Sequence, residues 1–279
     1  MIVPNLCCNM MMGGEDVDRI EVFKRWIAES SRIVAFTGAG VSTESGIKDF
    51  RSADGLYSEN WRSNTNDSTE SGIPDFRSVD GLYSQKFDYP PETIISHSFY
   101  ERRPEHFFQF YREKMLPLGF EPNITHRMLA KWEQEGKLSA VVTQNIDGLH
   151  QKAGSKRVYE LHGSVLRNYC TRCGKFHSAE FIKESAGVPK CDCGGTVKPD
   201  VVLYEESLDQ DTIENSVAAI RNADLLIVAG TSLTVYPAAG LIQYYPGNRL
   251  VLINRDETPY DRHADLVFHE SLGEVFAQL

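Results

Sequence analysis

The stretch Arg32-Ile-Val-Ala-Phe-Thr37, followed directly by Gly38-Ala39-Gly40, decides the expected fold of this chain. A short apolar run that ends in glycines is typical of a buried strand entering a tight turn. Comparable apolar runs recur along the chain, and they predict further strands at 140–143, 224–229, 249–253 and 265–268.

Helical patterns lie between these runs. A first amphipathic helix is predicted over 16–30 from apolar residues at helical spacing, namely Val17, Ile20, Phe23 and Ile27. Two more helices are expected at 123–135 and 211–222. Strands that alternate with helices imply βαβ units, so the predicted fold class is α/β with a Rossmann-like parallel sheet. Several strands end in Gly, Asn or Asp, and ligand-binding groups gather at that edge of such a sheet.

Composition limits the function classes. The chain has 279 residues, of which 41% are hydrophobic, and a formal net charge of −10. This charge argues against a nucleic-acid-binding surface as the main function. No apolar stretch reaches about 18 residues, so we expect no membrane-spanning helix and no membrane partner. Residues 1–15 lack a basic leader with a long apolar run, so we predict a disordered extension, no signal peptide and a cytoplasmic location.

Four of the six cysteines form two close pairs, Cys170-Thr-Arg-Cys173 and Cys191-Asp-Cys193. Without a secretion signal, such pairs indicate a metal site rather than disulfides. Four thiolates complete a tetrahedral zinc shell and leave no position open for a substrate, so we predict one structural zinc ion in a small module at 165–198. An iron–sulfur or redox site is the alternative, because the second pair is tighter than the usual C-x-x-C.

A tandem duplication lies next to the glycine turn. The segment from Ser42 to Ser58 recurs almost unchanged as Ser68 to Ser84, and only Lys48/Pro74 and Ala53/Val79 differ. A solenoid needs about three or more repeats, so two copies indicate a local duplication.

Polar residues follow several of the predicted strands. The Gly38-Ala39-Gly40 turn allows backbone N–H groups to approach a pyrophosphate, although Thr43 occupies the third glycine's place in the dinucleotide pattern. Thr143-Gln144-Asn145-Ile146-Asp147 and Gly230-Thr231-Ser232 also follow apolar strands, and Asn254 ends another. Each segment alone is a weak signal: an ordinary turn explains the glycines equally well, and a polar loop explains 143–150 better.

Glu160-Leu-His162-Gly-Ser164 places a histidine before a glycine, where the ring is sterically open. A near-neutral pKa suits an imidazole to general-base work. The chain has eight histidines, most of which are expected to be structural, so position alone does not select His162.

In combination and in this order, these segments resemble the sirtuin family of NAD-dependent protein lysine deacylases, especially its short bacterial-type members. The matching segments are Gly38–Ile47, Asp49-Phe-Arg51, Thr143–Asp147, Leu161-His-Gly163, the four cysteines, Gly230–Leu233 and Val235-Tyr-Pro237. The resemblance implies a Rossmann-like NAD-binding domain formed by 16–164 and 199–279, with the zinc module inserted between these parts.

The resemblance also implies residue roles. His162 is the expected general base, and Asn145 is the second residue expected to act in catalysis. The NAD-contacting set that it implies is Ala39, Thr43, Phe50, Arg51, Gln144, Asn145, Ile146, Asp147, His162, Gly230, Thr231, Ser232, Asn254 and Leu272. Residues 200–203 are expected to pair with an acetyl-lysine peptide as an added strand. NAD is then a co-substrate, and the implied products are free lysine, nicotinamide and O-acetyl-ADP-ribose.

The chain departs from the family pattern at several positions. Lys48 replaces a proline that Pro74 keeps, and Tyr204-Glu-Glu206 replaces a Phe-Gly-Glu-like stretch. We assign copy one of the duplication, with Phe50 and Arg51, to the cofactor site because it continues from the glycine turn. Copy two, with Asp75-Phe-Arg77, is the alternative.

Three other functions remain compatible with these residues. A mono-ADP-ribosyltransferase would use the same pocket, and a weakly active NAD-binding interaction protein would fit the duplicated cofactor loop. A hydride-transfer dehydrogenase fits least well, because the turn departs from its fingerprint and the four cysteines are then unexplained.

Overall fold

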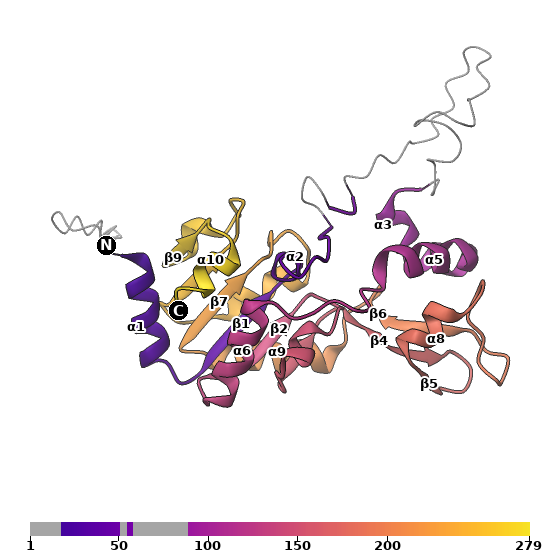
Figure 1. Ribbon diagram of the computed structural model, residues 1–279, viewed down its shortest axis with the longest axis horizontal. Coiled ribbons are helices and arrows are strands. Elements are labelled where there is room, and N and C mark those ends of the chain that lie inside the picture. The colour runs from indigo at the N-terminus through magenta and orange to yellow at the C-terminus, as the bar shows by residue number, and fades with distance from the viewer. Residues whose placement is uncertain (1–17, 51–54, 58–88) are drawn as a thin grey trace, which may run out of the picture.

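The computed structural model describes residues 18–50, 55–57 and 89–279. Its main feature is a parallel sheet with the strand order β3-β2-β1-β7-β8-β9 (Figure 1). The strands are β1 (Ile33–Thr37), β2 (Leu138–Thr143), β3 (Val158–Glu160), β7 (Leu225–Ala229), β8 (Leu250–Ile253) and β9 (Leu266–Phe268). Five of them lie where the apolar runs predicted strands, so the predicted α/β class is confirmed.

The centre of the sheet is buried on both faces. All five residues of β1 and all five of β7 are buried, and these two strands pair in parallel with Thr37 opposite Ala229. Successive side chains of a strand point to opposite faces. Ile33 and Ala35 therefore belong to one apolar cluster, and Val34 and Phe36 belong to another. This two-sided burial explains why the strands read as continuous apolar runs.

Helices cover both faces of the sheet. One face packs against α1 (Arg19–Glu29), α6 (Ile124–Gln134) and α10 (Leu272–Phe276), which contribute Phe23, Trp132 and Phe276 to its core. The other face packs against α9 (Gln210–Asn222) and the 3₁₀ helix η2 (Ala238–Tyr244). The remaining short helices near the sheet are α2 (Gly40–Thr43), α7 (Leu149–Ala153) and η3 (Asp261–His263).

Helix caps explain small differences from the expected boundaries. The predicted helix at 123–135 begins at Ile124, because the Asn123 side chain accepts hydrogen bonds from the backbone N–H groups of Thr125 and His126. The expected 211–222 helix begins one residue earlier, after Asp209, whose side chain accepts from Thr212 N–H. Both side chains accept hydrogen bonds from backbone N–H groups in the first turn, which have no partner within the helix.

A second, smaller sheet lies beside the first and has the strand order β5-β4-β6. Its strands are antiparallel and comprise β4 (Gly163–Cys170), β5 (Phe176–His177) and β6 (Val197–Val201), with helix α8 (Ala179–Glu184) alongside (Figure 1). A further helical layer packs against it through Phe107, Phe108 and Tyr111. This layer consists of α3 (Pro91–Ile94), α4 (His97–Arg102), α5 (Pro104–Phe110) and the π-helical turn η1 (Tyr111–Met115). The domain boundaries at 164/165 and 198/199 stay a prediction.

Some expectations fall on parts of the chain that the structure does not describe. The N-terminal extension at 1–15, Arg51 and the second copy at 68–84 lie outside the described residues. Within the described ranges, none of the helices combines the length and apolar character needed to cross a bilayer.

Leu226 provides a test of the sheet core, because it is fully buried in β7 between β1 and β8. We expect Leu226→Ala to destabilise the protein by about 2–5 kcal/mol, since it removes apolar contacts and leaves a cavity. The thermal midpoint should fall by roughly 5–15 °C. Leu166→Ala is the control, because Leu166 is 42% exposed. Equal midpoints for the two variants, measured by circular dichroism, would contradict this account of the core.

Candidate active site at the carboxyl edge of the sheet

The β1–α2 turn meets the end of β7 at very short range. Gly38 N–H donates to the Ala229 carbonyl at 3.1 Å, and Gly40 N–H donates to the Gly230 carbonyl at 2.8 Å. A Cβ at Gly40 would lie only 2.8 Å from Gly230 Cα. Gly230 itself has a φ of +61°, which side chains rarely tolerate. The glycines are therefore needed for the contact between two chain segments, in addition to any approach of a ligand.

A buried polar network lies directly beside this turn. The Ser42 hydroxyl donates to Asp147 Oδ2 at 2.7 Å, and Asn145 Nδ2 donates to the Ser42 hydroxyl at 3.1 Å. Asp147 Oδ1 also accepts from Leu149 N–H at 2.8 Å, at the start of α7. Burial raises the pKa of the Asp147 carboxyl, and these hydrogen bonds to the carboxylate act against that rise. The network holds Asn145 and Asp147 in fixed positions.

His162 lies where the chain passes from the large sheet to the small one. Its Nδ1 is 2.9 Å from the Gln144 carbonyl oxygen. A carbonyl only accepts hydrogen bonds, so Nδ1 carries the proton and Nε2 of the neutral ring has the basic lone pair. Gly163 follows with a φ of +74°, and a Cβ there would overlap the Asp200 carbonyl oxygen. Glycine after His162 is thus required by the β4–β6 pairing.

The structure distinguishes His162 from the other seven histidines. Among the eight histidines, His162 is the one that lines the cavity described below. His126 and His150 are buried behind the sheet edge with ring centroids 4.7 Å apart, and burial lowers the pKa of His126 to about 4. Burial also lowers the pKa of His150, whose Nε2 contacts the Thr37 hydroxyl at 3.0 Å. These two rings have structural roles, which the sequence alone did not reveal.

A cavity of about 820 Å³ opens in front of these groups. It brings together every described residue that the sequence analysis assigned to the cofactor: Ala39, Thr43, Phe50, Gln144, Asn145, Ile146, Asp147, His162, Gly230, Thr231, Ser232, Asn254 and Leu272. Arg51 lies outside the described residues. Segments that are far apart in sequence thus meet at one edge of the sheet, as expected for an open α/β fold.

Two further contacts order the far end of the cavity. Gln144 Nε2 donates to the Thr231 hydroxyl at 3.0 Å, which joins the end of β2 to the end of β7. Glu44 Oε1 accepts from Gly273 N–H at 2.8 Å in the first turn of α10. This second bond places Leu272 against the helix that begins after the glycine turn.

The opposite wall of the cavity is formed by the end of β6 and the chain after it. Val201, Val202 and Leu203 line this wall together with Ile95, whereas Tyr57 lines the cavity beside Phe50. Val202 N–H donates to the His162 carbonyl at 3.0 Å, so this segment lies next to the histidine. The sequence analysis expected residues 200–203 here but missed Ser42, Tyr57 and Ile95 as individual site residues. Ser42 and Tyr57 both lie inside the duplicated motif, and that duplication was the sequence signal that could have identified them as site residues.

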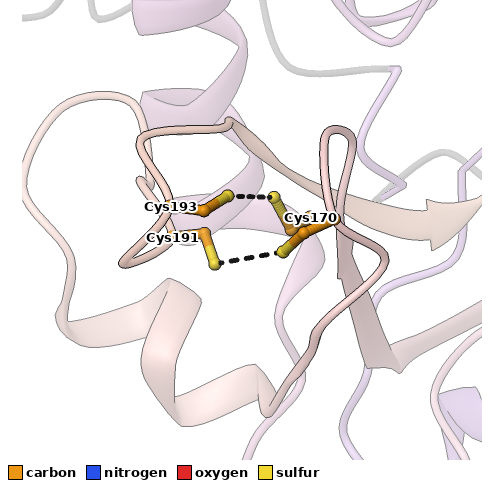
Figure 2. Close-up of side chains that lie close together, drawn as sticks. Cys170, Cys191 and Cys193 are labelled. Carbon is orange, nitrogen blue, oxygen red and sulfur yellow. Dashed lines mark hydrogen bonds between the residues drawn. The ribbon is translucent and has the colours of Figure 1, made fainter.

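The four cysteines of the small module converge, as the sequence predicted. Cys170 ends β4 and Cys173 lies in the turn that follows it, while Cys191 and Cys193 come from the loop before β6 (Figure 2). The Sγ atoms of Cys170 and Cys193 are 3.4 Å apart, and those of Cys173 and Cys191 are 3.7 Å apart. All four sulfur atoms lie within 4.8 Å of one another.

This arrangement fits zinc. Zinc–thiolate bonds of about 2.3 Å in a tetrahedron put sulfur atoms about 3.8 Å apart. The backbone N–H of Arg172 also points at Cys170 Sγ, at 3.4 Å, and such donors stabilise thiolate ligands. Four protein ligands complete the shell, so a zinc ion held here would tie the two loops together and take no part in chemistry.

An open parallel sheet with a dinucleotide-sized cavity at its carboxyl edge and a four-cysteine module beside it defines a class of two-part α/β proteins that bind nucleotides. Within that class, the chain belongs to the Sir2 family, whose family model matches residues 38–69 and 66–237. The two matched pieces contain copy one and copy two of the duplication, respectively.

Curated relatives match over nearly their whole length. The NAD-dependent protein deacetylase of Clostridium acetobutylicum is 55% identical over 261 residues, which cover 93% of this chain and 97% of that protein. The protein of the same description from Clostridium perfringens is 53% identical over 264 residues, covering 94% and 98%.

Solved structures show the same architecture. The complex described as "Sir2-p53 peptide-NAD+" has a TM-score of 0.74 at 38% identity and covers 93% of this chain and 96% of its own. The structure described as "Sir2 bound to acetylated peptide" gives a TM-score of 0.74 at 37% identity, with the same coverage.

The cysteine cluster leads to a metal-stoichiometry prediction. We expect about one zinc per purified chain by atomic emission spectrometry, because four converging thiolates form a complete shell. Cys191→Ala should lose most of this zinc and lower the thermal midpoint, since removing one ligand opens the shell and frees a loop. Ser178→Ala, at the N-cap of α8 in the same module, is the matched control and should retain the zinc. A full complement of zinc in Cys191→Ala would show that the cluster is not the site.

Proposed function

We propose that this chain is an NAD-dependent protein lysine deacetylase, which transfers the acetyl group of an acetyl-lysine side chain to ADP-ribose and releases nicotinamide. The observation that carries the proposal is the position of His162. His162, whose Nε2 is the basic nitrogen, lines a cavity that has strand-end polar groups on one side and the segment after β6 on the other. A dinucleotide and a peptide side chain can meet there.

The NAD end of the proposal rests on the polar edge of the large sheet. The Gly38–Gly40 turn, Thr231 and Ser232 would contact the phosphates and adenosine ribose, while Asn254 and Leu272 would hold the adenosine. Asn145 and Asp147 would line the nicotinamide pocket, because Ser42 fixes both side chains. NAD is consumed here as a substrate, so no hydride acceptor is required.

The peptide end rests on the segment after β6. Leu203 N–H donates to Glu206, and Val202 N–H donates to the His162 carbonyl. An acetyl-lysine peptide would add to this segment as a strand, with main-chain hydrogen bonds and the acyl-lysine side chain pointing into the cavity. The apolar side chains of Val201 and Leu203, together with Ile95 across the wall, would shield the acyl-lysine stem from water.

His162 would supply the proton transfer. The acetyl oxygen would form a bond to the ribose carbon as the bond to nicotinamide breaks, and a ribose hydroxyl would then attack the acyl carbon. The lysine nitrogen would leave as the free amine, and one water molecule would be consumed to give O-acetyl-ADP-ribose. Nε2 takes the proton from the ribose hydroxyls, and the Gln144 carbonyl stabilises the resulting imidazolium through Nδ1–H. General-base help of this kind is worth roughly 10²–10⁴-fold.

Copy one of the duplication would form the cofactor loop. Its described residues Ile47, Lys48, Asp49 and Phe50, with Leu56 and Tyr57, line the cavity. Phe50 would cover the reacting ribose, and Arg51, the next residue, would contact the phosphates. We also propose that the protein acts in the cytoplasm, because reducing compartments keep such cysteine clusters as metal-binding thiolates.

Removing the imidazole tests this function. We expect His162→Ala to lower kcat for deacetylation of an acetyl-lysine peptide by about 10²–10⁴-fold, because it removes the imidazole that takes the ribose proton. His106→Ala is the control, because His106 lies exposed on α5 away from the cavity. Nicotinamide release should require both the acetylated peptide and NAD. Release that needs no acetyl group and leaves ADP-ribose on protein would instead favour mono-ADP-ribosyl transfer.

The acyl preference gives a second prediction. In family members that remove succinyl groups, the helix after the cofactor loop carries a Tyr-x-x-Arg motif. The positions here that resemble this motif hold Phe108 and Tyr111, and both side chains are fully buried. Arg112 is the cation next in sequence, but it donates to the Gly187 carbonyl at 2.9 Å. A succinyl carboxylate placed beside Phe108 and Tyr111 would find no arginine at these two positions to balance its charge, and burying an unbalanced charge is costly.

We therefore expect the acetyl peptide to react at least about tenfold faster than the succinyl peptide in kcat/KM, a ratio that corresponds to about 1.4 kcal/mol. A propionyl peptide controls for size, because it is larger than acetyl but neutral, and it should resemble acetyl more than succinyl. A faster reaction with succinyl would overturn the assignment of acyl preference.

A further inference from the structure

Tyr204 lines the cavity directly after the proposed peptide-binding segment, and its main chain is hydrogen-bonded through both its N–H and its carbonyl. Tyr204 N–H donates to the Ile95 carbonyl at 3.1 Å, and His97 N–H donates to the Tyr204 carbonyl at 2.9 Å. Both partners belong to the junction between α3 and α4. Tyr204 is therefore attached to the helical layer at the point where the proposed peptide-binding segment ends.

The next two residues strengthen this attachment. Glu205 has a φ of +76°, an unusual conformation for a residue with a side chain, and its carboxylate accepts from Ser98 N–H at 2.9 Å and from the Ser98 hydroxyl at 3.1 Å. Glu206 accepts from Leu203 N–H at 2.9 Å and contacts Lys198 Nζ at 3.1 Å. Hydrogen bonds on each side thus fix the direction in which the Tyr204 side chain leaves the main chain.

Tyr57 belongs to the cofactor side of the cavity. Its N–H donates to the Phe50 carbonyl at 2.8 Å, and its ring makes an edge contact with the Phe50 ring at a centroid distance of 5.6 Å. The neighbouring Leu56 N–H donates to the Asp49 carbonyl at 2.8 Å, and Leu56 is only 7% exposed. A main-chain hydrogen bond and a ring contact thus hold Tyr57 and Phe50 together.

The two tyrosines meet across the cavity wall. Their hydroxyl oxygens are 3.0 Å apart, within hydrogen-bonding distance. This bond joins two segments that carry different ligands in the proposed function: Phe50 lies over the reacting ribose, and Val202 and Leu203 pair with the peptide. A shift of either segment alone would break it.

We propose that Tyr204 is a positioning residue that couples the NAD subsite to the peptide subsite through its hydrogen bond to Tyr57. The inference rests on the proposed function, because it assigns the peptide to the segment that Tyr204 ends. Each ligand orders one partner of the bond, so each ligand favours the arrangement that the other requires. By linkage, NAD then tightens peptide binding by the same factor by which the peptide tightens NAD binding.

The expected size of the coupling follows from the nature of the bond. A hydrogen bond between neutral, partly exposed groups has a net effect equivalent to a factor of about 2–10 in an equilibrium constant. The wild-type protein should accordingly bind an acetyl-lysine peptide about 2–10-fold more tightly when the NAD subsite is filled, and this gain should disappear when the bond is removed.

The experiment compares wild type with Tyr204→Phe and Tyr57→Phe, which remove one oxygen each. The affinity for a fluorescent acetyl-lysine peptide is measured by polarisation, without and with saturating carba-NAD, an analogue whose nicotinamide cannot leave. We expect both variants to bind the peptide alone as wild type does, to keep their thermal midpoints, and to lose the gain from carba-NAD. The double variant should lose no more than either single variant.

Tyr244→Phe is the matched control, because Tyr244 is 44% exposed on η2 and its ring contacts Arg221 away from the cavity. It should keep the full gain. A wild-type protein without any gain, an unchanged gain in Tyr204→Phe, or additive losses in the double variant would each overturn the inference. If the peptide is deacetylated normally under any of these outcomes, only the inference fails. If the wild-type protein neither binds nor deacetylates the peptide, the proposed function fails as well.

Discussion

The contact between the β1–α2 turn and the end of β7 is the constraint on which the rest of the structure depends. Gly38, Gly40 and Gly230 allow main-chain atoms to approach to a distance that no Cβ would permit. Because of this contact, α2 starts at the carboxyl edge of the sheet beside the ends of β2 and β7. Ser42, the third residue of α2, then reaches both Asn145 and Asp147. A wider turn would separate these three side chains.

The second requirement is the junction between the two sheets. The chain leaves β3 at Glu160 and enters β4 at Gly163, so His162 lies between the parallel and the antiparallel sheet. Arg167 on β4 contacts Glu160 at the end of β3 at 2.6 Å and Asp200 on β6 at 2.8 Å, so it links the two sheets beside this junction. The imidazole is therefore positioned by both sheets, and the Gln144 carbonyl determines its tautomer. The cavity takes one wall from the small sheet, through Val201, and its polar floor from the large sheet.

Residue patterns predicted the parts of the molecule that depend on local signals. The apolar runs gave five strands of the parallel sheet because burial on both faces leaves a continuous apolar signature. The cysteine pairs predicted the four-cysteine cluster because the spacing of zinc ligands in sequence follows from the geometry of the site. β3 was missed because Val-Tyr-Glu is short and half-buried. The helices over 91–115 were missed because each element there has seven residues or fewer, which is too short for a long periodic pattern. The resemblance to a family, rather than local pattern, selected His162, since its role depends on contacts between distant segments.

The strand order has a consequence for how the chain is made. β1 is complete once the first forty residues have left the ribosome, yet one of its two neighbours, β7, begins only at Leu225. The centre of the sheet cannot close until most of the polypeptide has been synthesised, whereas the cysteine module and its helices need only segments that are close together in sequence. In a nascent chain, β1 can therefore pair with β2 once Thr143 has been made, but its other edge stays open through the synthesis of the small sheet, which ends at Val201. A chaperone that covers exposed strand edges in this period would raise the yield of native protein.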